Sequence, residues 1–303
     1  MSDTASVFAV DDVTILTSTD GEPIALHDFG GDGPGPPLLL SHGNGLNAGM
    51  WAAALPALRE RYRCFGLDLR GHGRCRPVDP DYSIDSARFA DDIRCAIEAI
   101  GGPVRYAAHS LGAASAVTAA MTDTSPFVGL WLFEPVLLPT GFERNGDGPG
   151  PLIDISRRRR MNFDSVDDAF ERFVSKPPFA GCDPTAVRGY VELGTRPIDE
   201  GVRLSCRGVD EARVFESVVP FDFAALGAID RPTVLASGAA ANTLNALPPV
   251  LAPLVAEAIP GAVWEEHQGL SHFGPMERPD LMVESITALF DRIDDDPHLA
   301  SDA

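Results

Sequence analysis

Stretches typical of short buried strands alternate with stretches of helical periodicity along most of this chain. Residues 84–100 place apolar side chains at 84, 87, 90, 93, 97 and 100, which is the spacing of one helix face. Alternation of this kind is typical of a mostly parallel sheet covered by helices. The chain is therefore predicted to be an α/β protein. The expected strands are residues 13–17, 24–28, 38–41, 64–67, 104–108, 127–133, 233–237 and 262–266, and further helices are expected at 48–61, 111–121, 246–258 and 280–293.

The middle of the chain, residues 135–229, does not follow this pattern. It opens with a Gly/Pro-rich loop and shows no strand alternation. A helix is expected from Asp164-Ser165 onward, because acidic residues in its first turn favour the helix dipole. We therefore predict a helical cap at 135–229, inserted after the sixth strand into a core formed by residues 1–134 and 230–303.

The segment 104–112 carries the strongest chemical signal. A strand-like run is followed by Ala108-His109-Ser110-Leu111-Gly112 and then by a helix of small residues. A sharp turn between a strand and a helix presents a serine hydroxyl at the top of a sheet, and it requires small residues where strand and helix approach. Ala108 and Gly112 satisfy that requirement. Ser110 is the candidate nucleophile; the alternative is a serine in a purely structural tight turn.

Three further segments occur in a matching order. His42-Gly43-Asn44-Gly45 follows an apolar strand, residues 66–73 read GLDLRGHG after the next one, and residues 269–273 read GLSHF after the last one. With the serine turn, these segments closely resemble the α/β-hydrolase superfamily, although Ala108 replaces the usual first glycine. The resemblance implies an α/β-hydrolase fold that needs no cofactor. It also implies that the backbone N–H groups of Asn44 and Leu111 face a developing oxyanion.

Seven histidines compete for the role of catalytic base. His109 should point away from Ser110 at the turn, and His267 stands near the end of the last strand. His272 lies five residues later, in the loop that carries the base in the resembled superfamily. We predict His272 as the base. The other four lie in expected lead-in, loop or tail positions: His27, His42, His72 and His298.

The acid that would orient His272 is missing from its usual place. The loop after strand 233–237 contains no aspartate or glutamate, and Asp230 precedes that strand, at the wrong end of the sheet. Glu134 ends the preceding strand at its carboxyl edge, where active-site residues of open α/β sheets gather. Some haloalkane dehalogenases resemble this arrangement. Glu134 is therefore the predicted acid, with Asn242 as a weaker candidate; Glu134 meeting solvent or a cap arginine is the alternative.

The resemblance implies hydrolysis of a carboxylic ester or related acyl bond of a small molecule through an acyl-serine. Perhydrolysis, acyl transfer and carbon–carbon bond hydrolysis use the same residues and stay open. A binding protein with a vestigial triad is the alternative from another class. A serine at 110 argues against haloalkane dehalogenases and epoxide hydrolases, which need an aspartate there. Aromatic cap residues indicate either an apolar substrate or core packing: Phe142, Phe163, Phe170, Phe173 and Phe179.

The charge of the chain limits its partners. The formal net charge is −20, and Lys176 is the only lysine. Such an acidic surface repels phosphate backbones and anionic lipid, so neither nucleic acid nor a membrane surface is an expected partner. Adaptation to high salt and the codon bias of a GC-rich genome both account for the composition. The arginine run 157–160 is either a solvated helix face or an anion site, and we favour the first interpretation.

The cysteines and the N-terminus indicate a cytoplasmic location. The five cysteines form no C-x-x-C pair and have no metal-ligand spacing to a histidine, so we expect free thiols and no metal site. Free thiols fit a reducing compartment. Residues 1–12 lack a signal peptide's basic and apolar regions. No apolar run approaches the length of about 18 residues needed to span a bilayer.

Overall fold

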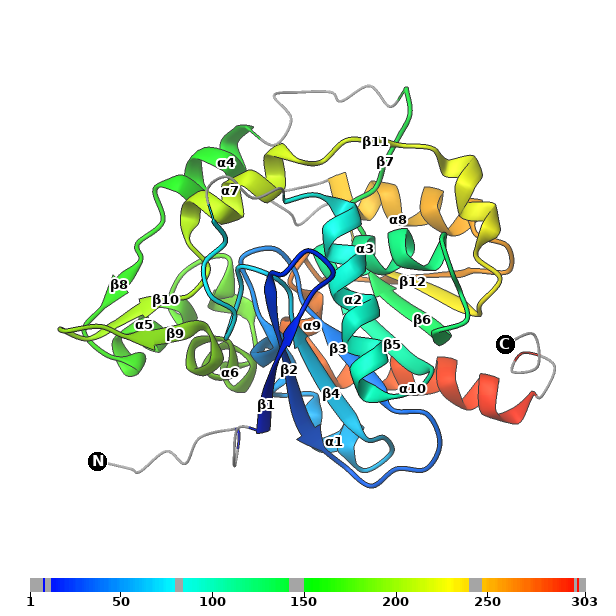
Figure 1. Ribbon diagram of the computed structural model, residues 1–303, viewed down its shortest axis with the longest axis horizontal. Coiled ribbons are helices and arrows are strands. Elements are labelled where there is room, and N and C mark those ends of the chain that lie inside the picture. The colour runs from blue at the N-terminus through cyan, green and yellow to red at the C-terminus, as the bar shows by residue number, and fades with distance from the viewer. Residues whose placement is uncertain are drawn as a thin grey trace.

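The central element of the computed structural model is an eight-stranded sheet of order β1-β2-β4-β3-β5-β6-β12-β13 (Figure 1). The structure describes residue 8 and residues 12–79, 84–141, 150–239, 247–296 and 299. β2 pairs antiparallel with β1 and β4, whereas every pairing from β4 to β13 is parallel, so the predicted mostly parallel sheet is confirmed. The strands are β1 (Asp12–Thr17), β2 (Pro23–Gly30), β3 (Leu38–Ser41), β4 (Cys64–Asp68), β5 (Val104–His109), β6 (Phe127–Phe133), β12 (Thr233–Gly238) and β13 (Val263–His267).

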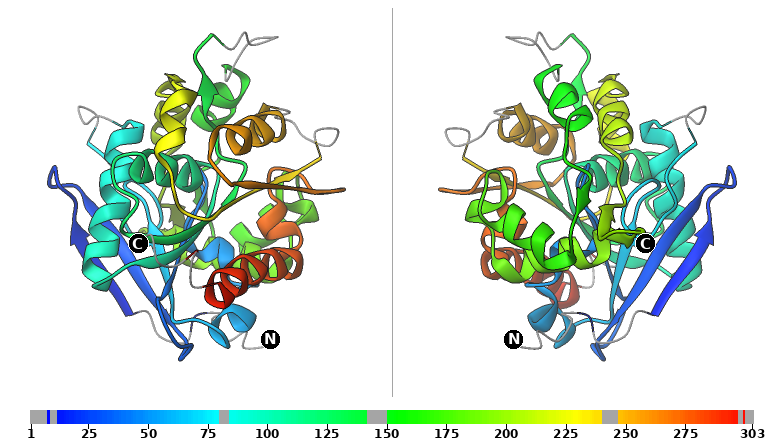
Figure 2. Two further views of the ribbon diagram at one scale, coloured as in Figure 1. Left: turned by 90° about the vertical axis from the view of Figure 1, so that its right-hand side faces the viewer. Right: turned by 90° about the vertical axis from the view of Figure 1, so that its left-hand side faces the viewer.

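Helices cover both faces of this sheet, as its two buried apolar faces require. One apolar cluster packs α1 and α10 against the sheet, and a second packs α2, α3 and α8 against its other face. Figure 2 shows α2 and α10 on opposite sides of the strands. These helices are α1 (Leu55–Arg59), α2 (Ser86–Ile100), α3 (Leu111–Ala120), α8 (Leu247–Ala258), α9 (Gly274–Glu277) and α10 (Pro279–Asp295).

The strand register brings four strand ends to one edge of the sheet. In the ladder, His109 of β5 pairs with Phe133 of β6, and Phe133 also pairs with Ala236 of β12. Gly238 of β12 pairs with His267 of β13. Because these strands are parallel, the residues that follow them meet at the carboxyl edge of the sheet, which is where ligands bind in open α/β folds.

The chain between β6 and β12 forms a separate set of short elements, drawn green to yellow in Figure 1. It contains helices, as predicted, and also short strands that the prediction lacked: β8, β10 and β9 form a three-stranded sheet, and β7 pairs with β11. Strands of two or three residues are too short for period-two alternation to be visible in sequence. The elements are β7 (Leu138–Pro139), α4 (Gly150–Arg157), β8 (Asn162–Phe163), α5 (Val166–Val174), α6 (Pro184–Gly194), β9 (Thr195–Pro197), β10 (Val202–Leu204), α7 (Gly208–Glu216) and β11 (Pro220–Phe221), with 3₁₀ helices at Phe179–Gly181 and Phe223–Ala228.

A second local difference concerns residues 48–61, predicted as one helix. They form a 3₁₀ helix, Ala48–Trp51, followed by the short helix α1. The Asn47 side chain accepts a hydrogen bond from the Gly49 N–H and caps the first piece, while Pro56 lies in the first turn of the second. Proline is favoured in a first helical turn because it has no N–H to lose there.

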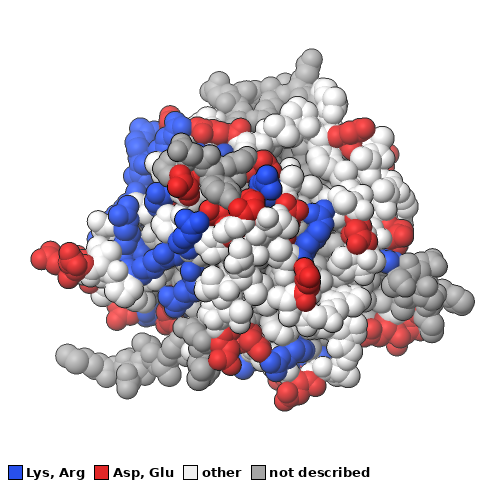
Figure 3. All heavy atoms as spheres, viewed as in Figure 1, with Lys and Arg blue, Asp and Glu red and all other residues white. Residues whose placement is uncertain are grey.

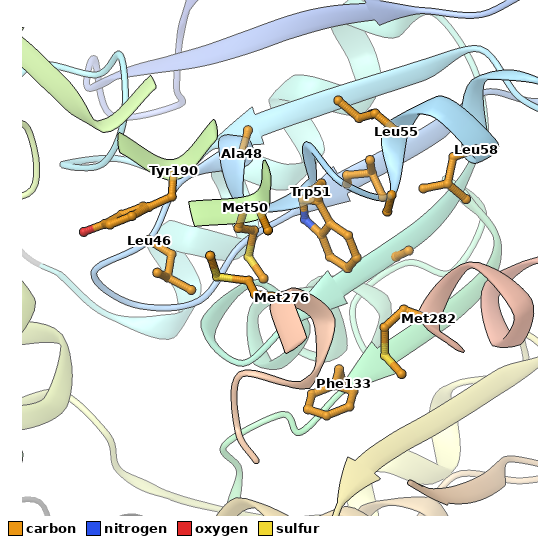
Figure 4. Packing of buried hydrophobic residues seen from close by; sticks show 14 of the residues in the cluster. Leu46, Ala48, Met50, Trp51, Leu55, Leu58, Phe133, Tyr190, Met276 and Met282 are labelled. Carbon is orange, nitrogen blue, oxygen red and sulfur yellow. The ribbon is translucent and has the colours of Figure 1, made fainter. Parts of the chain in front are cut away.

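One apolar cluster links the sheet, the helices and the insertion beneath the carboxyl edge. Figure 4 shows four of its side chains. Trp51 belongs to the 3₁₀ helix that follows β3, Phe133 to β6, Tyr190 to α6 and Met276 to α9. A methyl group on Gly274 would lie 2.4 Å from the ring of Phe133, so α9 packs directly on β6. The loop that precedes α9 is therefore held against the sheet.

The arginine run 157–160 is divided between solvent and the interior. Arg157, Arg158 and Arg160 are at least 46% exposed and pair with Glu216, Asp154 and Asp168, respectively, as expected for a solvated face. Figure 3 shows basic side chains gathered on the left of this view, where Figure 1 places the insertion. Arg159 departs from the prediction: its side chain is only 15% exposed and pairs with Glu211.

Candidate active site

Ser110 sits at a sharp turn between β5 and α3. Its backbone has φ 50° and ψ −106°, a conformation that costs about 1–3 kcal/mol and persists only where the surroundings impose it. The Ser110 N–H donates to the Phe133 carbonyl at 2.8 Å, which ties the turn to β6. A methyl group on Gly112 would lie 2.0 Å from Ser41 Oγ, so the small residue predicted there is required by packing.

His272 lies in the loop between β13 and α9 and contacts Ser110. Its Nε2 is 2.9 Å from Ser110 Oγ, and its Nδ1 is 2.5 Å from Glu134 Oε2. The carboxylate accepts the Nδ1 proton, which leaves the Nε2 lone pair to accept the Ser110 hydroxyl proton. The rival histidine, His267, is placed elsewhere: it belongs to β13, with its Nε2 3.9 Å from Glu265.

Glu134 follows β6 and is completely buried. Its φ is 48°, and within the described residues Ser110 and Glu134 are the only non-glycine residues with positive φ. Its second oxygen, Oε1, accepts the Gly238 N–H at 2.8 Å, and its own N–H donates to the Ala236 carbonyl. β12 thus fixes the carboxylate in one orientation. The weaker candidate, Asn242, lies outside the described residues.

The loop after β3 passes beside Ser110. A methyl group on Gly43 would lie 3.2 Å from Ser110 Cβ and 2.5 Å from His109 Nδ1. Within the described part of the chain, the backbone N–H groups of Asn44 and Leu111 donate to no other residue. Both groups are therefore available to an oxygen bound near Ser110, as the predicted oxyanion site requires.

Two buried histidines hold this loop to the loop after β4. His42 donates from Nδ1 to the Gly43 carbonyl and accepts the Leu69 N–H at Nε2. His72 donates from Nδ1 to the Arg70 carbonyl and accepts the Gly45 N–H at Nε2. Each ring uses both nitrogens, and only the neutral form can do so.

The insertion also holds the loop after β3, which the sequence analysis did not predict. Asn44 Nδ2 donates to the Glu211 carbonyl at 2.9 Å, and the Glu211 carboxylate pairs with Arg159 at 2.5 Å. Arg159 also donates to the Tyr190 hydroxyl. Arg159 belonged to a run interpreted as a solvated face, and sequence spacing gave no sign that Glu211, 52 residues later, would pair with it.

His109, predicted to point away from Ser110, contacts the loop that carries His272. Its Nε2 is 2.7 Å from the His272 carbonyl oxygen, and the two ring centroids are 4.7 Å apart. The side chain that precedes the candidate nucleophile is thus in contact with the backbone of the candidate base.

Burial keeps the histidines around the site neutral. Burial and the neighbouring His72 lower the pKa of His42 from 6.5 to about 3, and burial lowers the pKa of His72. Burial, with repulsion from His272, holds the pKa of His109 well below its usual value. A positive charge on any of these rings would be poorly solvated.

We expect the free energy of unfolding to decrease as pH falls below about 6.5. The pKa values of His42, His72 and His109 are lower in the folded chain than in the unfolded chain. Below about pH 6.5 the unfolded chain therefore binds more protons on these residues, and protonation favours the unfolded state. Three protons correspond to a slope of at most about 4 kcal/mol per pH unit. Urea unfolding between pH 7.5 and 5, above the range of most carboxylates, measures it. A free energy that stays constant over this range would contradict the neutral assignment.

We expect Gly43→Ala to lower kcat by about 10²-fold or more, because the methyl group would displace the loop from Ser110 and thereby move the N–H groups predicted to form the oxyanion site. Steady-state kinetics with an activated ester measures the effect, and thermal unfolding checks the fold. Gly102→Ala is the matched control, since nothing lies within 4 Å of a methyl group at that position. Equal activity of the two variants would argue against a tight loop at Gly43.

Three general features of the described residues remain. No group of three or more His, Cys, Asp or Glu side chains among them has the arrangement of a metal site. No helix in the described ranges is both long and apolar enough to cross a membrane. All five cysteines are described, and each is a free thiol.

Comparison with known proteins agrees with this fold. Protein phosphatase methylesterase 1 of Homo sapiens is 29% identical over 170 residues, covering 54% of this chain and 42% of the relative. Pimeloyl-[acyl-carrier protein] methyl ester esterase of Methylococcus capsulatus is 36% identical over 88 residues, covering 29% of this chain and 32% of the relative. The matches thus span less than half the length of these two relatives.

A solved structure extends the similarity to nearly the whole chain. The crystal structure of E-2-(acetamidomethylene)succinate hydrolase aligns with a TM-score of 0.74 at 20% identity, covering 93% of this chain and 100% of that one. At this identity the likeness concerns the fold alone. The model of the alpha/beta hydrolase family matches residues 38–285, which include the turn at Ser110, Glu134 and the loop of His272. The chain therefore belongs to the alpha/beta hydrolase family.

Proposed function

We propose that this protein is a serine hydrolase that cleaves a carboxylic ester or related acyl bond of a small molecule through an acyl-enzyme. One observation carries the proposal: the hydrogen-bonded series Ser110 Oγ, His272 and Glu134, with separations of 2.9 and 2.5 Å. A nucleophile, a base and a buried acid in this geometry are what acyl transfer at serine requires. The strained backbone at Ser110 and Glu134 supports a functional role, because strain of this kind collects at active sites.

The proposed reaction has two halves. His272 Nε2 takes the Ser110 proton while Oγ attacks the acyl carbon, and the N–H groups of Asn44 and Leu111 stabilise the oxyanion. The imidazolium, stabilised by Glu134, then protonates the departing alkoxide, which leaves as the alcohol. In the second half, water loses a proton to His272 and adds to the acyl-serine. Collapse of this intermediate releases the carboxylic acid and returns the proton to Ser110.

The relatives indicate which acyl bond to test first. Both curated relatives described above are named for the hydrolysis of methyl esters. A small alcohol leaves little for a pocket to hold, so we propose that the acyl part supplies most of the binding. Five cysteines without disulfide partners fit an enzyme of the cytoplasm.

We also propose that residues 135–229 act as a cap over the catalytic edge. The cap contacts the loop after β3 through Glu211 and Arg159. It reaches the base as well, since Phe179 packs against Phe273, the residue after His272, with ring centroids 5.2 Å apart. The cap therefore contacts both the loop after β3, which carries Asn44 (the oxyanion loop), and the loop between β13 and α9, which carries His272 (the base loop). A segment with both contacts is well placed to shape the acyl site.

The test is turnover of p-nitrophenyl esters of increasing acyl chain length, together with methyl esters of the same acids. We expect hydrolysis that saturates with substrate and depends on acyl length. Ser115→Ala is the matched control for Ser110→Ala, because Ser115 is a buried serine on α3 whose hydroxyl, among the described residues, donates to the Leu111 carbonyl of its own helix. Absence of turnover across the series, or turnover that survives in Ser110→Ala, would refute the proposal.

A further inference from the structure

We propose that His109 is a positioning residue that holds the backbone of His272 and so sets the base against Ser110. The inference rests on the proposed serine hydrolase function. It concerns a side chain that takes no part in the proton transfers described above. His109 is 1% exposed, and it is the residue immediately before the nucleophile.

The contact fixes which nitrogen of His109 carries the proton. A carbonyl oxygen can only accept, so the 2.7 Å contact from Nε2 to the His272 carbonyl requires a proton on Nε2. The Nδ1 atom is buried and has no partner among the described residues. It faces Gly43, where a methyl group would approach to 2.5 Å. One neutral ring thus lies between the oxyanion loop and the base loop.

The loop of His272 is held on both sides of the base. Before it, the Ser271 N–H and hydroxyl donate to the Glu277 carboxylate at 2.8 and 2.5 Å. After it, the His272 carbonyl accepts from His109. The backbone of the base is therefore restrained from two directions, while Glu134 restrains only the ring. The segment that carries the nucleophile contacts His272 twice in the described structure, since Ser110 bonds to the ring and His109 bonds to the backbone carbonyl.

One hydrogen bond and one peptide bond link the backbone of His272 to Ser110, through the side chain of His109. Ser110 and His109 are adjacent, so a movement of the turn carries the donor and the nucleophile together. Loss of the donor frees the His272 peptide to shift relative to Ser110, and misplacement by about 1 Å costs about 10²-fold in rate. Substrate binding makes no use of this bond, so kcat should fall while KM changes little.

The experiment compares His109→Gln with His109→Met. The two replacements have nearly the same shape, but only glutamine can donate to the His272 carbonyl. We expect His109→Met to lower kcat for an activated ester by about 10²-fold with KM within about twofold, and His109→Gln to recover at least a tenth of native kcat. Because the base is displaced in His109→Met, the pH at which kcat/KM reaches half its maximum should also shift in that variant alone. Thermal unfolding monitors the fold.

A second measurement requires neither turnover nor a variant that folds. Nitrogen-15 NMR of the native protein should show His109 protonated at Nε2 and not at Nδ1. Native kcat in His109→Met, equal losses in both variants, or a proton on Nδ1 would each overturn the inference. A purely structural role predicts lower unfolding temperatures with unchanged kcat. The native enzyme separates the two proposals. If it hydrolyses no ester, the proposed function fails, whereas the protonated nitrogen of His109 tests the inference independently of turnover.

Discussion

Ser110→Ala is expected to lower kcat for ester hydrolysis by about 10⁵ to 10⁶, and His272→Ala by a similar factor. Without the Oγ no acyl-serine forms, and without the imidazole nothing takes the hydroxyl proton at 2.9 Å. Because the two groups act in one step, the double variant should be no slower than either single variant. Stopped assays with p-nitrophenyl esters, run at high enzyme concentration, can resolve the residual rates.

The control for this prediction is His267→Ala. His267 lies five residues from His272, on the edge strand β13, and in the described part of the chain its ring pairs with Glu265 and not with Ser110. Its replacement should leave kcat within about twofold, since no triad hydrogen bond is lost. If His267→Ala were the crippling change, or if losses in the double variant multiplied, the assignment of the base would be wrong.

Glu134→Gln is expected to lower kcat by about 10³ or more, by analogy with amidation of a triad acid. Oε1 of Glu134 accepts the Gly238 N–H, so the glutamine should keep its carbonyl oxygen there and turn its NH₂ toward His272. An NH₂ donor facing Nδ1 forces the imidazole proton onto Nε2, where it opposes the Ser110 hydroxyl. The variant should therefore lose its general base while keeping its packing.

The measurement is kcat at saturating ester between pH 6 and 10, with unfolding by urea as the check on stability. Glu265→Gln is the matched control, because Glu265 is on β13 and bonds to Ser285, not to His272. A Glu134→Gln enzyme with near-native turnover would show that His272 takes its support from another group.

The residues at the site differ in how far sequence could predict them. Ser110, Glu134 and His272 follow strands whose carboxyl ends lie together once the sheet is parallel, so local pattern and topology suffice. The contact of His109 with the His272 carbonyl was not predicted, because it joins the end of β5 to a loop 163 residues later in the chain. Arg159 was misread because its partner, Glu211, approaches only after the insertion has folded.

The fold shows the same division. The sheet and its covering helices carry long apolar patterns that remain legible in sequence, and their existence was predicted correctly. The insertion contains strands of two or three residues, whose pairing depends on distant neighbours such as Asn162 with Arg203. The helix expected at 48–61 is divided because the Asn47 cap starts one short helix and a second, with Pro56 in its first turn, starts at Leu55. Periodicity cannot reveal either feature.

The most direct test of the central claim is the site of covalent labelling by a fluorophosphonate. Such a probe reacts with a serine only when a base and an oxyanion site activate it. We expect one adduct per chain, located at Ser110 by peptide mass spectrometry, with none in Ser110→Ala and strongly slowed labelling in His272→Ala. A native protein that stays unlabelled, or an adduct on any other residue, would contradict the account.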